Sequence, residues 1–174
     1  MFFLISFLVP LFLVASTTNA FYIPPLPSER AKEMQRYILR TLEAIESSPV
    51  SVSGDVKKYD LSIDELEDCI ESGFKERNLS SLVTVDDFDH YPDPATLQVK
   101  VVIVGKTTLV EVELIGEAVL SRSHTYIPAV MWKERAILNE ETQHQMKESI
   151  LHYVKKFTAQ ILDIYLDAKN DVLR

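Results

Sequence analysis

Apolar and polar residues alternate in the centre of this chain with a period of two, which is the spacing of a half-buried β-strand. In residues 97–114, valine, leucine and isoleucine alternate with polar residues on both sides of a turn that begins at Gly105. This pattern predicts an antiparallel hairpin with one buried and one wetter face. The second strand continues past Gly116, where we expect a bulge. A third strand is expected over residues 126–138, with Pro128 near its start.

A helical period of three to four residues precedes this hairpin. Ser62 is a good helix N-cap, and Glu65 three positions later completes a capping box, so a helix is expected to begin there. Acidic residues crowd its first half and Lys75 lies near its end, which matches the helix dipole. Asn78 is expected to close it. Its apolar face comprises Leu66, Cys69, Ile70 and Phe74.

The longest helical pattern lies at the end of the chain, where residues 142–169 predict a helix about 40 Å long. We favour core packing against the sheet for its apolar stripe, and Trp132, with Val130, is expected to pack under it. A part of the stripe that overhangs the sheet would instead be an interface. The candidate interface or pocket residues are Trp132, Met146, Ile150, Tyr153, Phe157, Ile161 and Tyr165.

The first 20 residues, MFFLISFLVPLFLVASTTNA, are typical of a secretory signal peptide. They combine an uncharged apolar run, a polar step and the small-residue tripeptide that ends at Ala20, after which we expect cleavage. No Lys or Arg precedes the run, so an uncleaved anchor is the alternative. Against an anchor, Pro10 and the polar step leave about 15 apolar residues, whereas a spanning helix needs about 20. We therefore expect a periplasmic or secreted protein with no stable membrane span after cleavage.

The remaining chain divides where serines and a proline interrupt the pattern at Ser47, Ser48 and Pro49. Before them, the FYIPPLP lead favours polyproline II, and a helix from Ser28 to Ser47 is expected to be accessory to the domain after it. Residues 50–61 predict one irregular strand or hairpin, and residues 82–85 predict a short strand. The expected parts are the signal peptide (1–20), the proline-rich lead with its accessory helix (21–48) and a single α+β domain (49–174).

Charge and cysteine content exclude several classes of function. The net charge of −8 argues against nucleic acid and anionic lipid surfaces as partners. Cys69 is the single cysteine, so no internal disulfide can form and packing must hold an exported protein of this kind together. Because Cys69 falls on the apolar side of its predicted helix, we interpret it as a small buried hydrophobe.

Motifs that would identify a reaction are missing from the sequence: it has no Gly-rich phosphate loop, G-x-S-x-G, C-x-x-C or H-E-x-x-H. The acidic run DDFDHYPDP lacks the glycine and glutamate of a calcium loop, so we interpret it as a solvated turn, with a metal-using enzyme as the weaker alternative. His144 and Glu148 lie one helical turn apart but off the apolar stripe, which favours solvated helix surface. We therefore expect no enzymatic activity, no cofactor and no metal.

A family resemblance rests on four segments, LSIDELEDCIESGFKERNL, PDPATLQVKVVIV, LVEVELIGEAVLSR and ILHYVKKFTAQILDIYLDAKN. Their order behind a signal resembles small uncharacterised exported bacterial proteins over about residues 50 to 170. In arrangement the chain is also similar to the auxiliary lipoproteins of outer-membrane assembly and lipid transport, which are accessory and non-catalytic. It departs from them by lacking the lipidated cysteine. The resemblance implies no catalytic residues for this chain.

We therefore expect a two-layer α+β sandwich, with helices on one face of a mostly antiparallel sheet. The leading functional hypothesis is a non-enzymatic exported accessory module that binds a protein or a component of the cell envelope. The alternative is a carrier that holds a small apolar ligand between sheet and helices, near Trp132, Tyr153 and Phe157.

Overall fold

A computed structural model describes residues 21–22, 29–54, 56–80, 94–120, 122–139 and 142–170. The predicted signal segment 1–20, the predicted strand 82–85 and the acidic residues of 86–93 lie outside this part of the chain. The described residues form an α+β fold, which confirms the predicted class.

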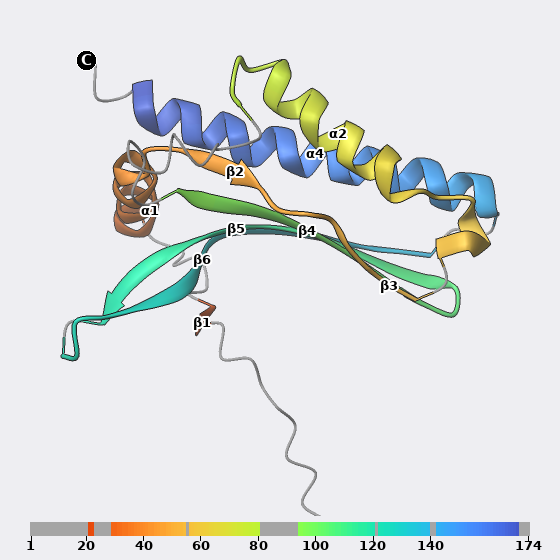
Figure 1. Ribbon diagram of the computed structural model, residues 1–174, viewed down its shortest axis with the longest axis horizontal. Coiled ribbons are helices and arrows are strands. Elements are labelled where there is room, and N and C mark those ends of the chain that lie inside the picture. Colours follow the sequence, from red (N-terminus) through yellow and green to blue (C-terminus); the bar gives the residue numbers. More distant parts are fainter. Residues whose placement is uncertain are drawn as a thin grey trace, which may run out of the picture.

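Six strands build one sheet in the order β1-β6-β5-β4-β2, and β3 pairs with β4 beside β2. The helices α2 and α4 lie over one face of this sheet, and α1 stands near its end (Figure 1). The strands are β1 (Phe21–Tyr22), β2 (Ile45–Ser47), β3 (Ser51–Ser53), β4 (Ala95–Val104), β5 (Thr107–Leu120) and β6 (Thr125–Leu138). The helices are α1 (Glu29–Thr41), the 3₁₀ turn η1 (Val56–Tyr59), α2 (Ile63–Lys75) and α4 (Gln143–Asn170).

The predicted hairpin is present as β4 and β5, which pair antiparallel from Thr96 with Ile115 to Val104 with Thr107. Alternate residues point to opposite sides of a strand, so one set faces the helices and the other faces away. The helix-facing set is fully buried and forms the centre of the core. Its fully buried apolar members on these two strands are Ala95, Leu97, Val99, Val101, Val110, Val112 and Leu114.

The bulge expected at Gly116 lies immediately before it, and the extra residue belongs to β6. Leu114 pairs with Trp132 and Ile115 pairs with Val130, so Met131 has no partner of its own. A Cβ atom on Gly116 would meet the Cε and Sδ atoms of Met131, so the flexible end of that side chain would have to move. Beyond the bulge Val130 no longer belongs to the core cluster, which corrects its predicted packing with Trp132 under the helix.

The N-cap predicted for α2 is confirmed. The backbone N–H of Glu65 donates to Ser62 Oγ at 3.1 Å, and the Glu65 carboxylate accepts from the Ser62 N–H at 3.0 Å. At the other end Asn78 adopts a φ of 55° and the Leu79 N–H donates to the Phe74 carbonyl, which terminates the helix.

The long helix α4 begins and ends within one residue of the predicted bounds. The Thr142 hydroxyl accepts from the Gln145 N–H at 3.2 Å and caps its first turn. Gly73 of α2 lies against Thr158 of α4, where a Cβ atom would be 2.9 Å from Thr158 Cγ2. The two helices therefore approach closely, and both lie over the same face of the sheet (Figure 1).

The expected accessory helix over 28–47 is wrong in extent and in role. Helix α1 ends at Thr41, and Ile45–Ser47 form strand β2, which pairs in parallel with β4. Leu39, Leu42 and Ile45 belong to the same core cluster as the rest of the domain. Residues 50–61 were expected to form one irregular strand or hairpin, and among those the structure describes, Ser51–Ser53 form the single short strand β3, which pairs in parallel with β4 and is followed by η1.

The proline-rich lead is described only at its first two residues. Phe21 and Tyr22 form β1, which pairs in parallel with Ala129 and Val130 of β6. The prolines of the lead, for which polyproline II was the expectation, lie outside the described ranges.

Candidate functional site

Five of the seven predicted interface or pocket residues are core residues. The exposed fractions are 0% for Met146 and Ile150, 1% for Ile161, and 5% for Phe157 and Tyr165. The core-packing interpretation of the stripe is therefore confirmed, and its five buried members offer no free surface to a partner. The reason is that the sheet, α1 and α2 together cover the apolar side of α4.

The other two residues, Trp132 and Tyr153, are half-buried and pack against the core cluster. The Trp132 indole donates to the Glu134 carboxylate at 3.1 Å, and the Tyr153 ring lies 5.4 Å from the Phe157 ring. These contacts are ordinary packing of aromatic side chains. None of these aromatic contacts specifically favours the ligand-carrier hypothesis, which stays a prediction.

His144 and Glu148 form an exposed contact on α4, with His144 Nε2 and Glu148 Oε1 3.2 Å apart and the side chains 80% and 67% exposed. This is the solvated helix surface that we expected. Within the described ranges no three histidine, cysteine or acidic side chains gather as metal ligands would.

The pairing of β4, β5 and β6 creates a second candidate surface on the sheet. The side of β4, β5 and β6 that points away from the helices is not covered by any described helix (Figure 1). We call this surface the open face. It is the wetter face that the alternation predicted, but the sequence did not indicate how its residues combine across strands. Its members include Gln98, Lys100, Val102, Val104, Leu109, Glu111, Glu113, Lys133, Arg135 and Ile137 and, by the same alternation, Thr96, Ile115 and Glu117.

The centre of the open face is a cluster of ion pairs around Glu113. The Glu113 carboxylate lies 2.8 Å from the Nζ atoms of both Lys100 and Lys133, and Lys133 also pairs with Glu111. Burial raises the pKa of Glu113, but the hydrogen bonds from Lys100 and Lys133 outweigh it and hold the pKa below its usual value. Burial lowers the pKa of Lys133, and its contacts with Glu111 and Glu113 reverse this, so the pKa is raised.

The open face displays positive charge although the whole chain is acidic. The side chains of Glu111 and Glu113 are only 13% and 6% exposed, whereas Lys100 is 37% exposed. Arg135 is exposed and has no ion-pair partner among the described residues, and Lys106 is exposed in the turn at the end of this face. Glu111 and Glu113 are therefore sheltered beside the cations, and the exposed charges of this face are those of Lys106 and Arg135 together with Glu117 at the far end of the same side of β5.

An aliphatic row borders the charged cluster on the open face. Val102, Leu109 and Ile137 are neighbours across the three strands, and Val104 follows at the end of β4. Val104 is 70% exposed and Ile137 is 67% exposed. Contiguous apolar surface rimmed by charged residues is typical of protein interaction sites.

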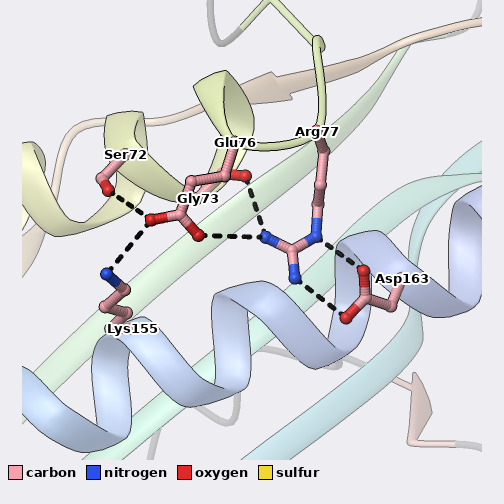
Figure 2. A network of polar contacts seen from close by, with 6 residues as sticks. All are labelled: Ser72, Gly73, Glu76, Arg77, Lys155 and Asp163. Atoms are coloured by element: carbon pink, nitrogen blue, oxygen red, sulfur yellow. Dashed lines mark hydrogen bonds and ion pairs between the residues drawn. The ribbon is translucent and has the colours of Figure 1, made fainter.

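On the opposite side of the molecule, polar contacts fasten α2 to α4 (Figure 2). The Arg77 guanidinium donates to both oxygens of Asp163 at 2.7 and 2.8 Å and to the Gly73 carbonyl at 3.1 Å. The hydrogen bond from Arg77 lowers the pKa of Asp163. Glu76 and Lys155 form a further pair at 3.1 Å. This network orients α2 and is a structural feature of the helix layer.

Comparison with known proteins adds no family. A scan against models of protein families finds no match for this chain, and a search of curated proteins finds none either. Of the described helices, none is both long enough and apolar enough to cross a membrane. We therefore base the functional proposal on the sequence and on the geometry of the open face.

Proposed function

We propose that this chain is a non-enzymatic accessory module, periplasmic or secreted, that binds a protein partner through the open face of its sheet. The observation that carries the proposal is the exposed aliphatic row beside a sheltered ion-pair cluster. A sheet presents such a row on a rigid backbone, so little conformational entropy is lost on binding.

The charge arrangement supports recognition of one partner over others. Because Glu113 lies under Lys100 and Lys133, both lysines are held in place before a partner arrives. Cations fixed in this way favour a partner that carries carboxylates and oppose one that carries a like charge. The aliphatic residues supply apolar area, and the cations select orientation.

Export is supported by the signal pattern in residues 1–20 and is consistent with the state of Cys69. Burial raises the pKa of the Cys69 thiol, which keeps it in its unreactive protonated form. The fold needs no disulfide, because a continuous apolar core joins the long helices to the sheet. Mass spectrometry of the N-terminus of the exported protein tests whether cleavage occurs after Ala20.

The proposal is tested by affinity capture from envelope extract with the full chain, tagged after Arg174 and exported by its own leader. We expect a stoichiometric partner that Ile137→Glu releases, because a carboxylate would lie in the aliphatic row. Tyr37→Glu is the matched control, since Tyr37 is 65% exposed on α1 and lies off the open face. A partner retained equally by both variants would contradict the open face as the binding site.

A further inference from the structure

We propose that the open face accepts a second copy of this chain, which docks the acidic side of its helix α2 there. The inference rests on the proposed binding role of the open face and names its partner. Both surfaces of the contact are visible in one molecule, and each supplies the charge that the other lacks.

The acidic side of α2 is defined by Asp64, Glu67, Asp68 and Glu71, and we call these residues the acidic stripe. They recur at three and four residues, so they line one side of the helix. Leu66, Ile70 and Phe74 occupy the buried side. Asp64, Asp68 and Glu71 are exposed, and no acidic-stripe residue forms an ion pair with another described residue.

The charges of the two surfaces are complementary. The acidic stripe presents four carboxylates, while the open face presents Lys100, Lys106 and Arg135, with Glu111 and Glu113 sheltered beside them. Two chains of net charge −8 repel each other at long range. At physiological ionic strength this repulsion is screened beyond about 8 Å, whereas contacts within the interface are shorter and persist.

The shapes of the two surfaces also agree. Helix α2 has 13 residues and is about 20 Å long. On the open face, the part of β4 between Gln98 and Val104 has a similar length of about 20 Å. Ile63 is 47% exposed at the first turn of α2 and would give the aliphatic row an apolar contact. The network around Arg77 holds α2 in place, so the acidic stripe is presented on a fixed scaffold.

The position of the two surfaces determines the kind of assembly. The open face lies on one side of the sheet, and α2 lies in the helix layer on the other side (Figure 1). A contact between them is therefore heterologous, with copies joined head to tail. Such contacts generate open chains of molecules unless the rotation between copies closes a ring.

Charge reversal in the full exported chain tests this assembly by sedimentation velocity. One variant changes the open face (Lys106→Glu with Arg135→Glu), and the other changes the exposed acidic stripe residues (Asp64→Lys, Asp68→Lys and Glu71→Lys), which leaves that stripe with net positive charge. We expect the unmodified chain to form larger species as concentration rises from micromolar to millimolar. Each variant alone should be monomeric, because its two docking surfaces then carry charge of the same sign.

An equimolar mixture of the two variants is the decisive experiment, and it should again sediment as a species larger than the monomer. In the mixture the altered open face of one variant can bind the altered acidic stripe of the other, because their charges are opposite. The unaltered open face and the unaltered acidic stripe also carry opposite charges. A further variant, Asp167→Lys on α4, lies off both surfaces and should associate like the unmodified chain. Circular dichroism spectra equal to that of the unmodified chain establish that each variant is folded.

An unmodified chain that stays monomeric at millimolar concentration, or a mixture that stays monomeric, overturns the inference. The proposed function has a separate readout in the capture experiment. If a different partner is still captured and is released by Ile137→Glu, the proposed function survives while the self-association fails.

Discussion

Replacing Glu113 with glutamine removes the carboxylate that joins two lysines on the open face. Glu113 is 5% exposed and accepts hydrogen bonds from the Nζ atoms of Lys100 and Lys133, both at 2.8 Å. A hydrogen bond to a charged group contributes about 1.5 to 3 kcal/mol. Because Lys100 is 37% exposed, its pair is partly screened by water. We therefore expect Glu113→Gln to lower the free energy of unfolding by about 2 kcal/mol.

The effect of Glu113→Gln should depend on pH with a definite sign. The pKa of Glu113 is lowered in the folded state, so the ionised carboxylate stabilises the fold above the unfolded-state pKa of about 4.3. That stabilisation is lost as the pH falls through the lower folded-state pKa. The difference between the unmodified chain and the variant should thus be full at neutral pH and shrink below about pH 4.

Urea unfolding followed by circular dichroism at neutral and acidic pH measures both quantities. Glu117→Gln is the matched control, because Glu117 is exposed on the same strand and has no described ion pair. It should change the free energy of unfolding by less than about 0.5 kcal/mol. A loss for Glu113→Gln no larger than that of the control, or one that does not change with pH, would refute the idea that the ion-pair cluster stabilises the open face.

Three further substitutions test the fold by thermal or urea unfolding. Thr108 is fully buried and its hydroxyl has no hydrogen-bond partner among the described residues, so Thr108→Val should stabilise the protein by about 1 kcal/mol; a loss of stability would show that the hydroxyl is satisfied. Gly116→Ala should destabilise it by no more than about 1 kcal/mol, because only the flexible end of the Met131 side chain has to move to admit the methyl group, and a much larger loss would show that Met131 cannot move. Ser62→Ala removes the N-cap of α2 and should cost about 1 kcal/mol, while Ser62→Asp, which keeps a capping oxygen, should cost less.

Local patterns predict the elements whose stability is decided by neighbouring residues. The capping box at Ser62, the hairpin turn at Gly105 and the start of α4 near Thr142 depend on a few residues of chain, and all are present in the structure. The stripe of α4 is correctly assigned to the core, because a face so uniformly apolar is stabilised only when it is covered.

Local patterns fail where distant segments compete with local preference. Residues 45–47 continue the helical spacing of α1, yet they form β2 because they pair with β4 about fifty residues later in the chain. Leu39 and Leu42 join the common core because α1 lies against α4. The extra residue of the bulge cannot be located from the glycine, because only the register between β5 and β6 shows that it is Met131.

The order of residues is sufficient for the α+β class, for the alternation that gives the sheet one buried and one wetter face, and for the acidic balance of the chain. Which residues become neighbours on the wetter face is decided only by the tertiary structure. Glu113 and Lys133 are 20 residues apart in the chain and become neighbours only through the register of β5 with β6. The same register aligns Leu109 with Ile137 as an exposed aliphatic row. A surface assembled across strands depends on long-range pairing, which no local pattern of residues contains.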